Sequence, residues 1–204
     1  MTVALPPAPE FGARLDLKPT PQVLDFLATR RSTSAVTLAT PAPSADELAI
    51  LLRLAARVPD HGKLAPWRFV ILEGAAKADF AAELEALAAG RGDQTAAAKL
   101  AKLKIPPLAV AVVSSPRNAA IPEWEQRLSA GAVCTTLLYA ALAMGYGANW
   151  ITDWYAYDAE AGAILGLGVE ERVAGFVLLG TPRESPMERE RPEIAPLVSR
   201  WRKP

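Results

Sequence analysis

The segment 122–145, PEWEQRLSAGAVCTTLLYAALAMG, is the most informative part of the sequence, because it predicts one long helix that is apolar on nearly every side. Pro122 suits the first turn of a helix and Gly145 suits the position just beyond the last turn, so we expect the helix to run from Glu123 to Met144. A helix that is apolar all round must be covered all round. The rest of the chain is short for that task, and we therefore expect a second copy of the chain to pack along this helix as a homodimer.

Shorter apolar segments on both sides of this helix predict a sheet. LAVAVV at 108–113 is apolar throughout, which is typical of a strand buried on both faces. Ser44 followed by Glu47 forms a capping box that opens a helix. The expected strands are 67–72, 108–113, 148–152 and 175–179, and the expected helices are 21–29, 45–58, 75–89, 94–104, 123–144 and 159–165. Because helices separate the strands, we expect an α+β fold with a central mixed sheet flanked by helices.

The composition is that of an ordinary globular chain. Of its 204 residues 51% are apolar and 22% are charged, and Lys+Arg and Asp+Glu both total 22. A net charge of zero provides no general basic field, so we expect neither nucleic acid nor a membrane as a partner. Because Cys134 is the only cysteine and His61 the only histidine, an internal disulfide and a cysteine-rich or histidine-rich zinc site are both excluded. We expect no metal.

Prolines gather near both ends of the chain and mark the expected boundaries. We expect an extended N-terminal arm at 1–20, one domain at 21–182 and a charged C-terminal tail at 183–204 that packs on the domain or on the partner. The N-terminus lacks the pattern of a secretory signal, and the longest apolar run, Ala130 to Met144, is too short to cross a bilayer. A soluble, cytoplasmic protein is the expectation.

Common catalytic motifs are missing from the sequence. It contains no GxGxxG after a strand, no GxxxxGK[ST] and no GxSxG, so chemistry carried by a bound cofactor fits better than chemistry carried by side chains. Arg30-Arg31-Ser32 offers two guanidiniums and a hydroxyl, which suit a phosphate monoester. Arginines are also common at helix C-termini because of the helix macrodipole, and on this motif alone that explanation is the commoner one.

Two further segments could contact a ligand, and each also has a structural explanation. The loop 57–69, RVPDHGKLAPWRF, presents Asp, His and Lys beside prolines. A single histidine is more often a structural hydrogen-bonding group, and Trp67 and Phe69 at alternate positions are more often core residues. The segment 145–154, GYGANWITDW, has two glycines that would let the backbone approach a heterocycle closely. It could equally be a connection from a helix to a strand.

Taken together, these segments resemble the nitroreductase family of flavoproteins, and its small, single-domain branch most of all. The resemblance covers residues 21–182 and is specific because the motifs occur in order, whereas each alone would be weak. The motifs are RRS at 30–32, PDHGKLAPWRF at 59–69, WEQRLSAG at 124–131, GYGANWIT at 145–152 and GFVLLGTP at 175–182. The resemblance implies an FMN-dependent nitroreductase-like fold, a domain-intertwined homodimer and one FMN at each dimer interface.

The resemblance also implies which side chains bind the cofactor. Those on the flavin phosphate and ribityl chain are Arg30, Arg31 and Ser32. Those along the isoalloxazine ring are Trp150, Ile151 and Thr152. Those that reach the flavin from the other subunit are Arg57 and His61. Lys63 joins Arg30 and Arg31 as a candidate cation for the N1/O2 edge, where positive charge favours the anionic reduced flavin.

The sequence departs from the family pattern at two places. Many relatives have an Asn or Gln amide just before the Pro-Trp pair, and here Ala65 takes that place, so the ring must be recognised in another way. Larger relatives also place a C-terminal basic residue on the phosphate. Arg183, Arg189 and Arg191 could all serve, although the ERER alternation equally suits a solvated tail, and we favour Arg183 because it follows the GTP turn directly.

The family reaction has two steps: NADH or NADPH passes hydride to flavin N5, and a nitroaromatic, quinone or enone then takes the electrons. No side chain is expected to be catalytic, because the flavin carries the chemistry. A flavin destructase and a reductive dehalogenase are alternatives on the same fold. The only sizeable insertion, 74–106, has no sequence pattern that indicates a substrate. A non-catalytic flavin-binding dimer and a structural homodimer without cofactor also stay open.

Overall fold

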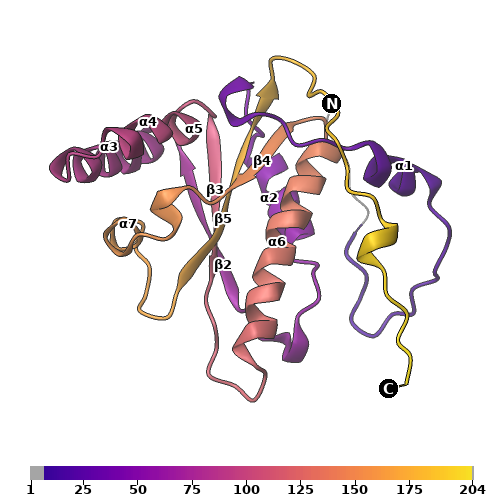
Figure 1. The fold of residues 1–204 in the computed structure, drawn as a ribbon. Helices are drawn as coiled ribbons and strands as arrows, with labels where there is room; N and C mark the ends of the chain where they lie inside the picture. Colours follow the sequence, from indigo (N-terminus) through magenta and orange to yellow (C-terminus); the bar gives the residue numbers. More distant parts are fainter. Residues whose placement is uncertain (1–6, 204) are drawn as a thin grey trace.

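The computed structural model describes residues 7–203, and its centre is a five-stranded sheet in the order β1-β5-β3-β2, with β4 also paired to β5 (Figure 1). The strands are β1 (Leu38–Ala39), β2 (Trp67–Glu73), β3 (Leu108–Ser114), β4 (Gly147–Ile151) and β5 (Arg172–Pro182). The α-helices are α1 (Pro21–Thr29), α2 (Ala45–Ala55), α3 (Gly74–Gly90), α4 (Gln94–Lys99), α5 (Ala101–Lys104), α6 (Glu123–Ala143) and α7 (Ala159–Ile164). The short 3₁₀ helices are η1 (Ala35–Thr37), η2 (His61–Lys63), η3 (Trp154–Ala156) and η4 (Ala195–Leu197).

The buried strand β3 divides two hydrophobic cores. Its residues Leu108, Val110 and Val112 face the core shared with α2 and α6, whereas Ala109 and Ala111 face the core shared with α3, α5 and α7. This alternation follows from the two-residue period of a strand. Both faces of the sheet are therefore covered, as an uninterrupted apolar strand predicts, and the expected α+β fold is confirmed.

The sheet is antiparallel rather than mixed, which corrects one detail of the prediction. Every strand pair in residues 7–203 is antiparallel. Between β2 and β3 the helices α3, α4 and α5 lead away from the end of β2 and back to that same end, so Glu73 pairs with Leu108. A connection that returns to the end it left makes its two strands antiparallel.

Most predicted elements occur within a few residues of their expected bounds. The Ser44 hydroxyl accepts from the backbone N–H of Glu47, and the Glu47 carboxylate accepts from the backbone N–H of Ser44 at 2.9 Å, which confirms the capping box. The helix expected at 94–104 is interrupted at Leu100, a fully buried residue. The last strand is longer than predicted, because β5 pairs with three other strands.

The long helix α6 is buried on one side only. The side that faces the sheet and α2 consists of Gln126, Ser129, Ala130, Val133, Cys134, Leu137, Leu138 and Ala141. On the other side Trp124 and Leu128 are 68% and 54% exposed. Residues 7–203 therefore do not supply in full the cover that the apolar sequence of this helix requires.

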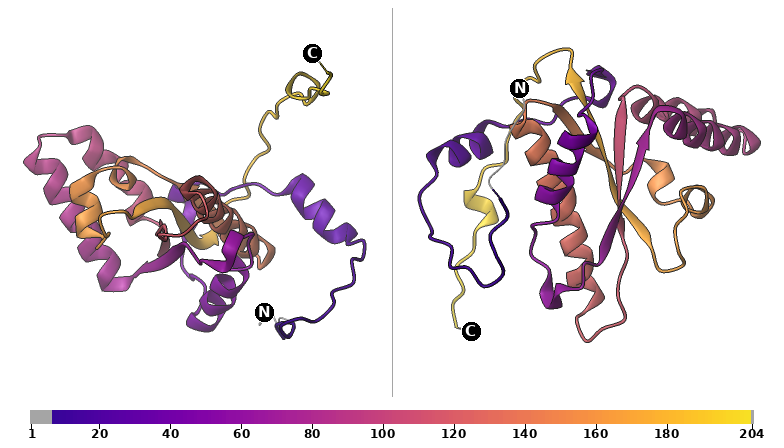
Figure 2. Two further views of the ribbon diagram at one scale, coloured as in Figure 1. Left: turned by 90° about the horizontal axis from the view of Figure 1, so that it is seen from below. Right: turned by 180° about the vertical axis from the view of Figure 1, so that it is seen from behind.

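Both ends of the described chain project from the body of the molecule (Figure 2). Helix α1 buries none of its residues, and Val23, Leu24 and Leu27 on it are exposed. The C-terminal tail likewise exposes Leu197 and Trp201. The part of the expected arm at 7–20 forms neither helix nor strand, and residues 1–6 lie outside the described residues.

Candidate functional site

The chain that follows α1 is fastened to the edge of β4. The backbone N–H of Thr33 donates to the carbonyl oxygen of Ala148 at 2.9 Å, and the Asn149 side-chain amide donates to the carbonyl oxygen of Thr33. Gly147 permits this approach, because a Cβ there would lie 3.1 Å from Oγ1 of Thr33 and 2.5 Å from Cδ2 of Leu38. The RRS and GYGANWIT motifs, which are far apart in the sequence, are therefore neighbours.

A cavity of about 610 Å³, called the arginine cavity below, opens beside this junction. Its volume is within the range of about 300–1,000 Å³ that is usual for ligand pockets. Its lining comes from the chain after α1, from β4 and from the C-terminal tail: Arg31, Ser32, Thr33, Ser34, Thr37, Asn149 and residues 184–189. Nε of Arg31 donates to the carbonyl oxygen of Met187 at 2.9 Å. The hydroxyls of Ser32 and Ser34 have no hydrogen-bond partner among the described residues. A positioned guanidinium and available hydroxyls suit an anionic ligand.

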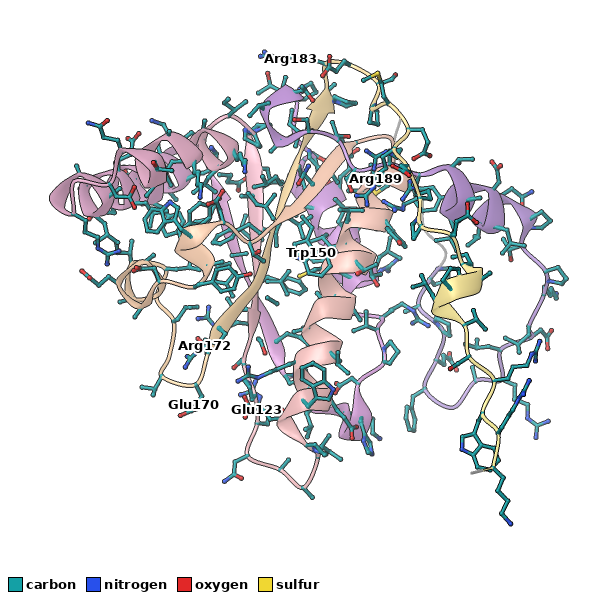
Figure 3. The ribbon with its side chains drawn as sticks, viewed as in Figure 1. Glu123, Trp150, Glu170, Arg172, Arg183 and Arg189 are labelled. Carbon is teal, nitrogen blue, oxygen red and sulfur yellow. The ribbon has the colours of Figure 1, made fainter. Side chains whose placement is uncertain are left out.

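The other arginines expected at a phosphate lie in different places. The Arg30 guanidinium stacks over the Tyr139 ring of α6, with Cζ 5.2 Å from the ring centre. Arg183 follows the end of β5, where its backbone N–H donates to Thr37, and its side chain does not line the cavity (Figure 3). Arg189 does line it. Arg189 is therefore the tail arginine that accompanies Arg31.

The loop at 59–66 is held in a constrained conformation by Asp60. The Asp60 carboxylate accepts from the backbone N–H groups of Leu64 at 3.1 Å and Ala65 at 2.8 Å. Lys63 and Ala65 both have positive φ values, 55° and 44°, which non-glycine residues adopt rarely. The side chains of His61 and Lys63 are thereby turned outward and exposed, and the N–H of Ala65 is already used within the loop.

Contacts with α6 fix this loop at the N-terminal end of the helix. The Ser129 hydroxyl donates to the carbonyl oxygen of Pro59 at 2.8 Å and accepts from the Trp67 indole at 3.2 Å. Nδ1 of His61 lies 2.7 Å from a Glu125 carboxylate oxygen. The Arg30 contact with Tyr139 lies fourteen residues further along α6, about 21 Å at 1.5 Å per residue. One chain by itself therefore keeps the His61 loop away from the arginine cavity.

The Trp150 indole lies against Gly175 of β5. Its Nε1 donates to the carbonyl oxygen of Ala174 at 3.3 Å, and a Cβ on Gly175 would come within 1.9 Å of the same nitrogen. Trp150 as a whole residue remains 39% exposed. Next along the strand, Ile151 packs against the core, and the Thr152 hydroxyl accepts from the Tyr157 hydroxyl at 2.8 Å.

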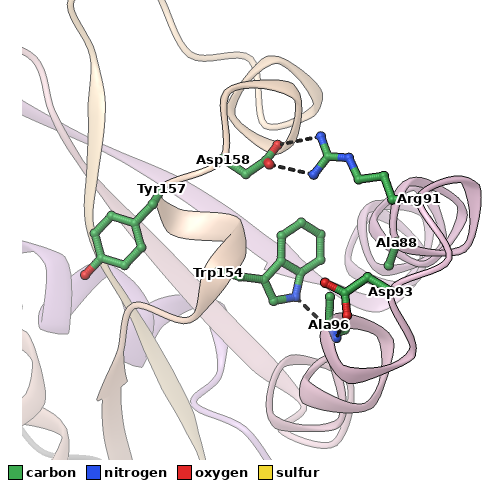
Figure 4. A pocket seen from close by; sticks show the side chains of 7 residues that line it. All are labelled: Ala88, Arg91, Asp93, Ala96, Trp154, Tyr157 and Asp158. Carbon is green, nitrogen blue, oxygen red and sulfur yellow. Dashed lines mark hydrogen bonds and ion pairs between the residues drawn. The ribbon is translucent and has the colours of Figure 1, made fainter.

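A second cavity, of about 390 Å³, lies between α3, α4 and η3 (Figure 4). The Arg91 guanidinium contacts both oxygens of Asp158 and one oxygen of Glu160, which raises the pKa of Arg91 and holds the pKa of Asp158 below its usual range. The Trp154 indole donates to the carbonyl oxygen of Ala96 at 3.0 Å. Arg91 and Asp158, which line this cavity, are thus paired with each other. The cavity therefore has fewer charged groups available to bind a ligand than the arginine cavity has.

Two other kinds of chemistry find no support in residues 7–203. Burial raises the pKa of the Cys134 thiol to about 12, so this side chain is not a thiolate nucleophile at neutral pH. In the same residues no three His, Cys, Asp or Glu side chains gather as a metal-binding group.

No helix within residues 7–203 has both the length and the apolar content needed to cross a membrane.

Comparison with known proteins assigns the chain to a family. The model of the family described as "Nitroreductase family" matches residues 27–181. The chain belongs to the nitroreductase family. An Escherichia coli K12 relative named "Putative NAD(P)H nitroreductase YdjA" is 35% identical over 163 residues, which cover 78% of this chain and 88% of the relative. A Haemophilus influenzae relative of similar name is 34% identical over 173 residues, covering 82% and 91%.

Solved structures share this nitroreductase fold. A nitroreductase-like family protein from Bacillus cereus superposes with a TM-score of 0.74 at 19% identity, over 92% of this chain and 98% of its own. A Bacteroides fragilis nitroreductase with bound FMN gives 0.66 at 21% identity, over 88% and 98%. The family and fold expected from the motifs are therefore confirmed, while the roles of individual side chains remain predictions.

Some residues at the arginine cavity were not identified from the sequence. Asn149 lies inside a motif that was singled out, but nothing there showed that its amide would reach Thr33. Met187 and Glu188 lie in the charged tail, whose ion pair between Arg191 and Glu188 at 3.0 Å fits the expected self-paired tail. The contact of that tail with Arg31 depends on the three-dimensional path of the chain, so the sequence pattern did not predict it.

Proposed function

We propose that this member of the nitroreductase family is an FMN-dependent NAD(P)H oxidoreductase that acts as a homodimer. A bound flavin supplies the redox chemistry, taking hydride from NADH or NADPH at N5 and passing electrons to a nitroaromatic, quinone or enone. The name of the Escherichia coli relative and the FMN in the Bacteroides fragilis structure support this. The observation that carries the proposal is the cavity in which Arg31, Ser32 and Arg189 meet beside β4.

The donors in this cavity fit the phosphate end of FMN. Guanidinium groups bind phosphate through charge-assisted and often bidentate bonds, and only Nε of Arg31 is engaged in its contact with the tail. Ser32 and Ser34 add hydroxyl donors, which suit phosphate or ribityl oxygens. We therefore assign the phosphate to Arg31, Ser32 and Arg189, and we move Arg30 to a supporting role against Tyr139.

The edge of β4 and its continuation would bind the flavin ring. Beyond its last paired residue, Ile151, the chain continues through Thr152, whose hydroxyl already accepts a hydrogen bond from Tyr157. The Thr152 proton is thereby left to be donated to a ligand atom. Because the Ala65 N–H is bonded to Asp60, that residue does not replace the amide seen in relatives, and β4 becomes the preferred source of ring contacts.

The exposed side of α6 would form the centre of the dimer interface. Trp124, Leu128, Ala132 and Thr135 recur every three or four residues and follow one stripe of the helix, with the first two largely exposed. The apolar side chains on α1 and on the tail are also exposed. A partner subunit that packs on α6 and also contacts α1 and the C-terminal tail would bury the exposed apolar side chains of all three segments, as in a domain-intertwined dimer.

Such a dimer would also complete the site. In a two-fold dimer whose α6 helices pack antiparallel, the N-terminal end of one helix lies beside the C-terminal end of the other. The exposed Arg57, His61 and Lys63 of one protomer would then approach the arginine cavity of its partner. Such a dimer would account for the distance of about 21 Å along α6 that separates, in one chain, residues that the resemblance places in one site.

The purified protein tests this proposal through its absorbance, its size and its reaction with nicotinamides. We expect a dimer in sedimentation that binds FMN with a flavin spectrum, and loss of that spectrum under anaerobic NADH or NADPH. Arg31→Ala should weaken FMN binding by about 10- to 100-fold, the equivalent of about 1.5–3 kcal/mol for a charged hydrogen bond. Arg183→Ala, a matched change outside the cavity, should leave FMN binding as it is.

Each outcome has a distinct meaning. Protein that binds no FMN would contradict the proposed function. Bound FMN that neither nicotinamide reduces would instead support the non-catalytic flavin-binding dimer. Equal FMN affinity in the Arg31 and Arg183 variants would reject the phosphate assignment alone.

A further inference from the structure

The arginine cavity already contains an anion from its own chain. Arg31 and Arg189 line it together with Glu184 and Glu188, so its arginine and glutamate charges cancel. Oε1 of Glu188 lies 3.6 Å from Nε of Arg31, and the carbonyl oxygen of the preceding residue, Met187, accepts from that same Nε. The tail therefore meets Arg31 with a carboxylate and a carbonyl side by side.

We propose that Glu188 is an internal competitor for the anion site, and that a phosphate monoester engages Arg31 fully only when this carboxylate moves away from it. The inference deepens the proposed function and rests on it. A carboxylate is a natural substitute for phosphate at a guanidinium, because both present oxygens that accept charge-assisted hydrogen bonds. Glu188 would thus limit the affinity of the site for phosphorylated ligands.

The contacts of Glu188 show that its carboxylate is charged. The N–H of Arg189 donates to it at 2.7 Å, and Nη2 of Arg191 lies 3.0 Å away. The hydrogen bond from Arg189 and the nearby charges of Arg191 and Arg31 lower the pKa of Glu188. An ionised carboxylate is the form that competes with a phosphate.

The same surroundings show that Glu188 can be displaced. Its side chain is 58% exposed, and it lies in a stretch of tail without helix or strand. Ion pairs this exposed are weak, because water competes for both partners. Arg191 offers the departing carboxylate another partner, so an incoming dianion could take Arg31 without leaving Glu188 unpaired.

The competition predicts a difference between two flavins. FMN carries the phosphate that Glu188 would oppose, whereas riboflavin lacks it. Removing the charge of Glu188 should tighten FMN, and also inorganic phosphate, and should leave riboflavin unaffected. A tail that only supported the cavity structurally would change both flavins in the same direction.

The test compares the full-length apoprotein with Glu188→Gln and with Glu190→Gln, a matched charge removal just outside the cavity lining. Flavin fluorescence titration gives the dissociation constants of FMN and riboflavin, and thermal stabilisation reports on inorganic phosphate. We expect Glu188→Gln to bind FMN about three- to tenfold more tightly, as suits a charge removed from an exposed site. Glu190→Gln should match the wild type.

The results separate this inference from the proposed function. Equal FMN affinity in the wild type and in Glu188→Gln would overturn the inference and leave the proposed function intact. A gain in FMN affinity as large in Glu190→Gln as in Glu188→Gln would do the same. If the wild type binds neither flavin, the proposed function fails. The inorganic phosphate series then decides: greater stabilisation of Glu188→Gln upholds the competitor, and equal stabilisation refutes it. Unchanged circular dichroism in both variants confirms that each is folded.

Discussion

Replacing Gly175 with alanine should expel the Trp150 indole from β5 and lower the free energy of unfolding by about 2–3 kcal/mol. The added Cβ would lie 1.9 Å from Nε1 and 2.4 Å from Cδ1 of the indole, far closer than van der Waals contact. At Gly175 the backbone of β5 is held by pairing with Val112 of the buried strand β3, whereas Trp150 lies on the edge strand β4. The indole, rather than the backbone, is therefore the group that moves.

The magnitude follows from what the indole would lose. Trp150 is 39% exposed, so about three-fifths of it is shielded from water. Full burial of a large apolar side chain contributes about 1.5–3 kcal/mol, and this fraction of it contributes about 1–2 kcal/mol. The hydrogen bond to the carbonyl oxygen of Ala174 adds about 1 kcal/mol.

A double-mutant cycle isolates this contact. Urea denaturation at one fixed protein concentration would be measured for the wild type, Gly175→Ala, Trp150→Ala and the double variant. Once the indole is absent, Gly175→Ala should cost nothing, because the clash has been removed. The indole lies in the segment expected along the flavin ring, so Gly175→Ala should also weaken FMN binding.

Two results would refute this reasoning. One is a Gly175→Ala protein as stable as the wild type, which would show that the indole relocates without loss. The other is an equal cost of Gly175→Ala in both backgrounds, which would place the strain in the backbone of β5 and not in the indole.

Three further predictions concern the loop, the dimer and acid stability. Ser129→Ala should lower the free energy of unfolding by about 1–3 kcal/mol, because it leaves the half-buried Trp67 indole N–H and the Pro59 carbonyl without their partner, and a neutral result in urea denaturation would contradict this. Leu128→Glu on the open face of α6 should convert the dimer to monomers in sedimentation, whereas Val169→Glu, an equally polar change in the exposed loop between α7 and β5, should remain dimeric. The hydrogen bond from Arg68 lowers the pKa of Glu171 from 4.5 to about 2, so its stabilisation is present above pH 4.5 and is lost as the pH falls through 2. Urea midpoints should therefore fall less steeply over this range for Glu171→Gln than for the wild type, and parallel profiles would disprove the assignment.

Local structure could be read from the sequence with good accuracy. The bounds of α1 are those predicted, the capping box of α2 is present, and α6 and β3 end within a residue of expectation. These features depend on neighbours three or four residues away, or on an apolar run. The motifs gave the family, which the comparisons confirm.

The arrangement of the site could not be predicted from local patterns. Arg31 meets Met187 across 156 positions of the chain, and the choice of Arg189 over Arg183 at the cavity depends on how the tail turns after β5. Hydrophobic periodicity reports which residues are buried, but not which distant segment lies beside them.

The sequence by itself determined the helices, the strands, the two-sided burial of β3 and the apolar surplus of α6, because each is recorded in residue type at short spacing. Only the tertiary structure decided that the sheet is antiparallel, that Trp150 rests on Gly175 and that a glutamate from the tail faces Arg31. These are pairings between segments far apart in the chain. They depend on the three-dimensional path of the connections, and residue types at short spacing do not encode that path.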